Sequence, residues 1–446
     1  MKTILYSLSS ALLLLTSCES FLTVEPKEEL SGTNAITDGA SALTAINGVY
    51  NGLGADAYYG WTYPAFGYLS GDNVQWTGSQ NFVQQFIDHD ISTDNTYIAQ
   101  GWAGIYEVID RANHVIAAVP GLPLQNDFDQ ATKDQYTGEA HFIRGLAYFD
   151  LARAWGGVQI VTEPTLSSSD KRGIPRSSLD QTYAQVLADL DQAFALLPET
   201  VNRFRATKNT VRALKARFHL YQGDWALAEQ FATEIINQTN NYELIGPYGS
   251  FFTDNVRGTK ESIFELFYSA NNTNGHRTFW QSSINGGQRQ WAPNDALVAL
   301  LNTPTTGGNR NVLIAQDNQG KWYGNLYYRS PFTDPAYILR IAEQYLIRAE
   351  AKARIGEDLT GALADLNAVR LRAGLEALEG LNADGILLAI ENERRLEFAL
   401  EGDRWFDLVR TERATEVLDV TDPNKLLFPI PYNQTVVDDL DPNPGY

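Results

Sequence analysis

Apolar residues recur every three to four positions along most of this chain. The clearest runs lie at residues 42–49, 105–116, 142–149, 179–194 and 390–400. This spacing gathers apolar side chains on one face of an α-helix. Ser177 and Ser178 are suited to cap the start of one such helix, and Pro198 to end it. The pattern predicts a mainly α-helical protein.

The helical spacing fades between about residues 240 and 336. Gly, Asn, Thr, Trp and Tyr dominate there, and residues 263–268 form a short apolar run suited to a strand. Connections this long inside a compact domain are usually functional or disordered, and the aromatic content argues against disorder. We therefore expect long ordered loops with a few short strands, inserted into a single domain that spans residues 18–446.

Two segments have the pattern of a helix pair. Residues 213–237 turn near Gly223, and residues 343–372 turn near Gly356. In each segment small residues lie where two helices would cross, and large apolar residues flank them, as in tetratricopeptide repeats of about 34 residues. Neither copy has the full consensus, so two ordinary helical hairpins are the alternative. The pattern favours a tetratricopeptide-like helical-repeat scaffold, an α-solenoid.

The N-terminus has the features of an export signal. Lys2 precedes an apolar run from Ile4 to Leu15, and the single cysteine, Cys18, follows a small residue. A short positive region, an apolar stretch and a small-residue site define a secretory signal, and the run is too short for a membrane span of about 20 residues. We interpret residues 1–17 as a lipoprotein signal peptide and Cys18 as the lipidation site. An ordinary signal peptide with an incidental cysteine is the alternative.

Composition excludes several classes of function. The 446 residues include 54 acidic and 34 basic side chains, which gives a net charge of −20. Proteins that bind nucleic acid neutralise its phosphates with basic patches, so we expect no nucleic-acid partner. A single cysteine allows neither an internal disulfide nor a thiolate metal site. The five histidines are scattered without metal-ligand spacing, so we expect no metal and no cofactor.

A charged block at residues 391–410 invites an enzymatic interpretation. Opposite charges lie three or four positions apart in it: Glu391 with Arg394 and Arg395, Glu401 with Arg404, and Asp407 with Arg410. Such spacings pair charges on one helix face, at about 0.2–0.5 kcal/mol for each exposed pair. We interpret the block as a structural ion-pair network. A glycoside hydrolase needs only two carboxylates, so a hydrolase stays open as an alternative. It is the least favoured one, because no motif of a known catalytic site is found.

Seven motifs, taken in order, resemble the SusD/RagB family of Bacteroidetes surface lipoproteins. They lie at residues 21–27, 139–163, 205–208, 339–343, 367–375, 393–410, and 429–431 with 443–446. The most distinctive reads EGDRWFDLVR, at residues 401–410. The resemblance implies a SusD-like α-solenoid with an irregular ligand-binding face. It also implies a non-catalytic, glycan-binding lipoprotein of the outer membrane that serves a TonB-dependent, SusC-like transporter; peptide uptake by a RagB-like subunit is the alternative.

A glycan site needs exposed aromatic rings for the faces of the sugars and polar groups for their hydroxyls. The resemblance places these contacts in a loop after the first helix and in the irregular middle region. The predicted platform is Trp76, Trp280 and Trp291, with Trp322 as a fourth ring and Asp72, Asn73 and Gln290 as hydroxyl contacts. For each of these tryptophans, the alternative to ligand contact is a buried ring that anchors its loop to the core. Strong acidity suits a saline habitat, so the expected glycan is a marine one such as the β-glucan laminarin.

Overall fold

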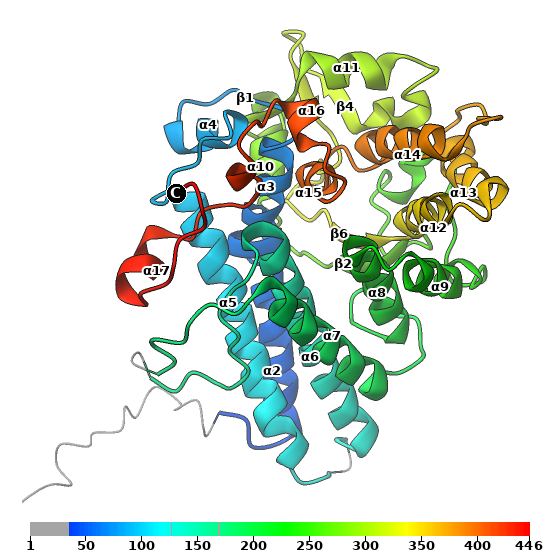
Figure 1. Cartoon of the computed structure of the whole chain (residues 1–446). Helices are drawn as coiled ribbons and strands as arrows, with labels where there is room; N and C mark the ends of the chain where they lie inside the picture. Colours follow the sequence, from blue (N-terminus) through cyan, green and yellow to red (C-terminus); the bar gives the residue numbers. More distant parts are fainter. Residues whose placement is uncertain (1–34, 126, 168–169) are drawn as a thin grey trace, which may run out of the picture.

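The computed structural model describes residues 35–125, 127–167 and 170–446. Cys18 and the expected signal peptide therefore lie outside the described residues. Figure 1 shows a mainly helical body with short strands in its irregular part, so the predicted fold class is confirmed. Among the described residues no helix is both long enough and apolar enough to cross a membrane.

The elements follow one another in the order that the sequence pattern predicts, helices first, then irregular chain, then helices. The helices are α2 (Gly39–Leu53), α3 (Thr62–Leu69), α4 (Asn81–Ile87), α5 (Thr96–Ala118), α6 (Gln130–Trp155), α7 (Leu179–Leu196), α8 (Lys208–Gln222), α9 (Trp225–Ile236), α10 (His276–Trp280), α11 (Asp295–Asn302), α12 (Ile341–Ile355), α13 (Leu359–Arg372), α14 (Ala383–Glu397), α15 (Arg404–Arg410), α16 (Ala414–Leu418) and α17 (Tyr432–Val437). The strands are β1 (Val74–Trp76), β2 (Ser262–Leu266), β3 (Trp291–Pro293), β4 (Ile314–Gln316), β5 (Trp322–Gly324) and β6 (Ala336–Arg340).

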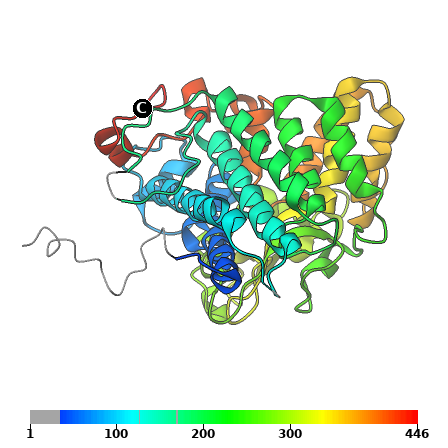
Figure 2. The same cartoon turned by 90° about the horizontal axis from the view of Figure 1, so that it is seen from below.

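Both predicted helix pairs are present. Helix α8 packs on α9 and α12 packs on α13, and α9 also packs on α12, so the two pairs form one stack (Figure 2). The turns end at Gly223 and Gly356, whose φ angles of 72° and 82° lie in the left-handed region that glycine adopts without a Cβ clash. Small buried side chains separate the helices where the pairs meet: Ala216, Ala228, Ala232 and Ala351.

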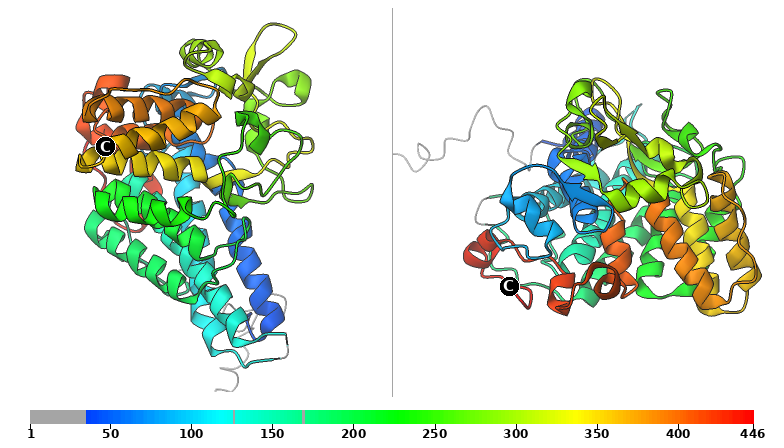
Figure 3. Two further views of the ribbon diagram at one scale, coloured as in Figure 1. Left: turned by 90° about the vertical axis from the view of Figure 1, so that its right-hand side faces the viewer. Right: turned by 90° about the horizontal axis from the view of Figure 1, so that it is seen from above.

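The irregular region lies along one side of the helical stack (Figure 3, left). Its expected strand near residues 263–268 is present as β2, which pairs antiparallel with β6. Strand β6 runs directly into α12, so this two-stranded sheet connects the irregular region to the second helix pair. The remaining strands pair as β1 with β3 and β4 with β5, both antiparallel.

A buried carboxylate connects the helical repeats to the irregular region. Glu397, at the end of α14, accepts hydrogen bonds from Arg310 Nε at 2.9 Å, from Arg340 Nη1 at 3.0 Å and from Arg372. Glu261 binds the last two arginines, at 2.8 and 2.9 Å. Burial opposes ionisation of Glu397, but Arg372, Arg310 and Arg340 outweigh it and lower its pKa to about 2. These five residues are the Glu397 network.

The charged block forms ion pairs, but most of them join different segments. Only Asp407 and Arg410 pair at the predicted spacing, at 2.9 Å. The others find more distant partners: Glu401 binds Arg340 at 2.6 Å, Arg394 binds Asp407 at 2.6 Å, Glu391 binds Arg413 at 2.8 Å, and Arg395 and Arg404 bind Asp72 at 3.1 and 2.7 Å. The prediction of pairs along one helix face is wrong for these, because α14 and α15 bury the side chains against other elements.

The substitution Glu397→Gln should lower the free energy of unfolding by about 3–5 kcal/mol. It removes one carboxylate from three buried arginines at once, and breaking a buried ion pair by removing one partner costs about that much. Equilibrium unfolding in urea measures the change. The matched control is Glu357→Gln, at the exposed turn after α12, which should stay within about 0.5 kcal/mol of wild type.

The pH profile of the same two variants gives the second readout. The pKa of Glu397 falls from 4.5 in the unfolded chain to about 2 in the folded one. Its contribution to stability is therefore complete above pH 4.5 and is lost as the pH falls toward 2. Glu397→Gln should lose stability less steeply over this range than wild type. Equal stability of Glu397→Gln and wild type at pH 7 would contradict the role assigned to the network.

Candidate functional site

Three loops of the chain meet at one end of the molecule. Strand β1 pairs with β3, with Trp76 opposite Trp291, and the β4–β5 hairpin packs beside β3. Figure 1 shows this end at the top, around β1 and β4. The segment after Trp76, the segment before Trp291 and the turn before Trp322 are thereby brought side by side.

A cavity of about 210 Å³ lies between these loops. Its lining is almost entirely polar and comes from all three: Thr77, Ser283, Gln288, Arg289, Asp317, Gln319 and Lys321. We term this cavity the loop cleft. It collects amide, hydroxyl and charged groups that can donate or accept hydrogen bonds to a polar ligand.

Backbone hydrogen bonds hold the loops of the cleft. Thr77 N–H donates to the carbonyl of Gln290 at 2.9 Å, and Gln288 N–H donates to the carbonyl of Thr278 at 2.7 Å. In the β4–β5 turn, Asp317 Oδ1 accepts from the N–H groups of residues 319 and 321, both at 2.9 Å. The cleft is therefore built on ordered loops, which suits a binding site.

Arg289 occupies an unusual position in the cleft. Its φ angle is 49°, in a region that few residues other than glycine adopt. Its N–H donates to the carbonyl of Gln281 at 2.8 Å, and its Nε donates to the carbonyl of Trp322 at 2.6 Å. Burial lowers the pKa of the Arg289 guanidinium, and nearby Asp317 partly offsets this. The Arg289 side chain is thus held in place through its Nε and is part of the cleft lining.

Two of the rings predicted to be exposed are buried. Trp280 and Trp291 have 0% of their surface exposed, so the expectation that they form an open platform is wrong. Trp291 stacks on Phe279 with ring centroids 4.4 Å apart, and Trp280 meets the edge of Tyr68 at 5.3 Å. The two rings also contact each other at 5.9 Å. They anchor the floor beneath the loops, which is the alternative role that the sequence leaves open.

The predicted hydroxyl contacts Asp72 and Asn73 are engaged within the protein. Asp72 forms ion pairs with Arg404 at 2.7 Å and Arg395 at 3.1 Å, and buried Asn73 accepts from Arg395 Nε at 2.8 Å. These contacts join the turn before β1 to α14 and α15. The expectation that both side chains face a ligand is therefore wrong in this structure, because each is bound to an arginine of α14 or α15.

The other three predicted residues adjoin cleft residues in sequence, but none of them is part of the cleft lining. Trp76 and Trp322 are half-buried, and each is adjacent in sequence to a cleft residue; Gln290 is half-buried beside Arg289. Their contact with a ligand stays a prediction. Sequence reasoning missed Arg289, Asp317 and Lys321 as cleft residues. Arg289 lies in the polar stretch between Trp280 and Trp291, and the run DNQGK at residues 317–321 is a turn signal that was available in the sequence.

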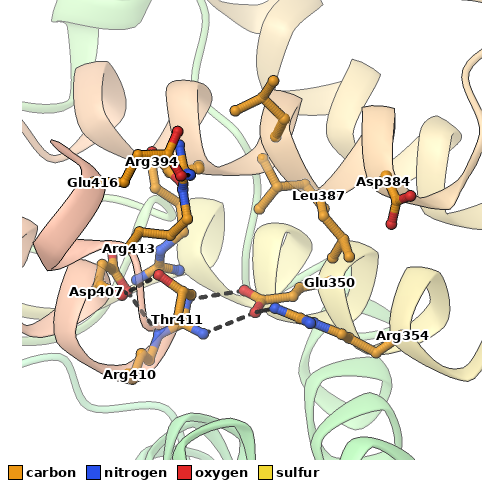
Figure 4. A pocket seen from close by; sticks show the side chains of 13 residues that line it. Glu350, Arg354, Asp384, Leu387, Arg394, Asp407, Arg410, Thr411, Arg413 and Glu416 are labelled. Carbon is orange, nitrogen blue, oxygen red and sulfur yellow. Dashed lines mark hydrogen bonds and ion pairs between the residues drawn. The ribbon is translucent and has the colours of Figure 1, made fainter.

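A second cavity of about 430 Å³ lies between α12, α14, α15 and α16 (Figure 4). Its central charges neutralise one another: Arg410 binds Glu350 through two hydrogen bonds of 2.8 Å, and Asp407 accepts from Arg394 and Arg410. This is the ion-pair network expected of the charged block. Over residues 35–125, 127–167 and 170–446, no group of three or more His, Cys, Asp and Glu side chains is arranged to hold a metal ion.

The burial of Trp291 predicts a structural role that mutation can separate from ligand contact. Trp291→Ala should lower the free energy of unfolding by about 3–5 kcal/mol, because it opens a cavity among packed aromatic rings. Trp322→Ala, at a half-buried ring, should cost clearly less. Chemical unfolding followed by circular dichroism compares the two. Wild-type stability in Trp291→Ala would contradict the assignment of this ring to the core.

Known proteins resemble the chain over most of its length. A family model described as "Starch-binding associating with outer membrane" matches residues 20–220, and a model of the SusD family matches residues 266–426. SusD-like protein P38 of Formosa agariphila is 26% identical, over 91% of this chain and 90% of its own length. SusD-like protein P2 of the same organism is 25% identical over 99% of both chains.

Solved structures share the fold. A SusD superfamily protein from Bacteroides vulgatus has a TM-score of 0.82 at 21% identity, over 92% of this chain and 99% of that one. A laminarin-binding SusD-like protein has a TM-score of 0.80 at 22% identity, over 92% of this chain and 100% of its own. The two family models together cover most of the sequence, and full-length relatives agree with them. The chain belongs to the SusD/RagB family, a family of non-catalytic glycan-binding proteins associated with the outer membrane.

Proposed function

We propose that this protein captures a polysaccharide or oligosaccharide at the loop cleft. One observation carries the proposal: ordered loops gather polar side chains in one cleft, and the half-buried rings Trp76 and Trp322 adjoin two of those residues in sequence. An apolar ring supplies affinity for the face of a sugar, and a few fixed polar groups supply orientation. Membership of a glycan-binding family supports the same function.

The captured glycan is passed to a TonB-dependent, SusC-like transporter in the outer membrane. The sequence of residues 1–18 supports this step, since acylation at Cys18 would tether the protein to the cell surface. Two or more acyl chains hold a protein stably at a membrane. Confinement to one membrane raises the effective concentration of the two partners.

The first neutral ligand to test is a laminarin-type β-glucan. A protein of the same fold is described as laminarin-binding, at 22% identity to this chain. A polymer of this class presents pyranose faces for ring stacking and hydroxyl groups for the amides of Gln288 and Gln319, which both line the cleft.

Glycan binding and its location are tested together by affinity electrophoresis and titration calorimetry. The purified protein should be retarded in a gel that contains its ligand, with laminarin, xylan, starch and levan as the first panel. Trp76→Ala and Trp322→Ala should each weaken binding by about 5–150-fold, because a stacked ring contributes about 1–3 kcal/mol. The matched control is Trp225→Ala, at a half-buried ring on α9 in the helical repeats, which should bind like wild type.

Two outcomes would contradict the proposal in different ways. Equal weakening by Trp225→Ala and the two cleft variants would show that the site is elsewhere. No binding of wild type to any neutral or acidic glycan would remove the glycan function. Binding of peptides in that case would favour the RagB-like alternative.

A further inference from the structure

The loop cleft contains two cations, Arg289 and Lys321, that form no salt bridge with a described carboxylate. No described carboxylate lies within 4.0 Å of the nitrogens of Arg289 or of the ammonium of Lys321, although both residues line the same cavity. The buried arginines Arg340 and Arg410, by contrast, pair with carboxylates. Cations without a salt bridge in a chain with a net charge of −20 need an explanation.

The guanidinium of Arg289 is held through its Nε, while its two Nη groups make no hydrogen bond with the described residues. Its backbone adopts a φ of 49°, and such conformations persist where the surrounding structure enforces them, often at ligand sites. Its Nε is occupied by the carbonyl of Trp322. Among the described residues, neither Nη1 nor Nη2 has a hydrogen-bond partner. Both Nη groups of this cleft-lining residue are therefore free to donate to a ligand.

Asp317 is the one acidic residue in the cleft lining, and its single charge can offset only one of the two cations. Its Oδ1 is used by the N–H groups of Gln319 and Lys321, each at 2.9 Å. The hydrogen bond from the backbone of Lys321 lowers the pKa of Asp317, and the nearby charges of Lys321 and Arg289 lower it further. Two cations and one carboxylate leave the cleft with a net positive charge of one.

We propose that the loop cleft binds the oxyanion of an acidic glycan, through Arg289 with Lys321 as a second cation. The proposal rests on the glycan function proposed above and names the substituent that the cleft selects: a carboxylate of a uronic acid or a sulfate ester. A guanidinium binds either oxyanion through two parallel hydrogen bonds. The sugar ring that bears it then lies beside Trp322, whose carbonyl holds Arg289.

The net charge of the whole chain does not oppose such a contact. Exposed charges are screened beyond about 8–10 Å at physiological salt, so the local cations govern binding inside the cleft. A neutral glucan such as laminarin would use the rings of Trp76 and Trp322 but would leave Arg289 without a partner. An acidic glycan of the same backbone should therefore bind more tightly.

Matched glycan pairs test this inference by titration calorimetry. One pair is laminarin and laminarin carboxylated at C6; the other is a sulfated galactan and its desulfated parent, so the pairs separate carboxylate from sulfate. The charged member should bind about 10–150-fold more tightly, because a hydrogen bond to a charged group contributes about 1.5–3 kcal/mol. Arg289→Asn should abolish this preference, and asparagine tolerates the positive φ at this position.

Further variants separate recognition from folding. Arg289→Lys keeps the charge without the two-pronged donor, so part of the preference should return. Lys321→Gln should reduce the preference, and Lys260→Gln, at an exposed lysine outside the cleft lining, should leave it unchanged. All variants should keep the wild-type unfolding midpoint within a few degrees.

Each result decides between the two proposals. Equal affinity for the charged and neutral members of both pairs, or a preference that survives Arg289→Asn, would overturn the oxyanion site while glycan capture stands. A preference in one pair alone would identify the oxyanion. No binding of wild type to any glycan in either pair, or in the neutral panel above, would overturn the glycan function itself.

Discussion

The buried carboxylate of Glu397 is the contact on which the arrangement of this protein depends. It joins Arg310, which precedes β4, to Arg340 at the end of β6 and Arg372 at the end of α13. One side chain thereby sets the position of the irregular region against the helical repeats. Removing these charges from water is costly, and the cost is offset only while every member is paired. We infer that the network specifies one relative placement of loops and helices.

The sequence predicts those features that depend on near neighbours. Helical periodicity and the turns at Gly223 and Gly356 are local properties, so the repeat scaffold is correctly predicted. Burial of Trp280 and Trp291 is different, because it depends on the pairing of β1 with β3 across more than 200 positions. A tryptophan in a polar loop looks exposed until that partner strand is placed.

The same limit explains the errors in the charged residues. A spacing of three positions predicts an exposed pair on one helix, yet Asp72 reaches Arg395 and Arg404 from the other end of the chain. Ion pairs between distant segments form here because burial lowers the local dielectric constant and so strengthens the attraction between their charges. The cleft cations were not predicted for a related reason: Arg289 and Lys321 are 32 positions apart in sequence, and only the folded loops bring them into one cavity.

The architecture separates stability from recognition. Paired charges and buried rings hold the scaffold, whereas the loops at one end gather polar side chains and two cations without a salt bridge. Loops on a rigid scaffold are where binding residues are usually found. The second cavity, between α12 and α16, belongs to the stabilising scaffold, because Arg410 and Arg394 in its lining already pair with carboxylates.

Hydrogen–deuterium exchange of the whole protein, with and without a bound glycan, tests this division most directly. Backbone amide hydrogens exchange more slowly when a bound ligand covers them or makes local opening of the structure rarer. The account predicts that glycan slows exchange in residues 77–80, 283–290 and 316–322, while α12, α14 and α15 are unchanged. Slower exchange in those helices, with the three loops unaffected, would contradict it.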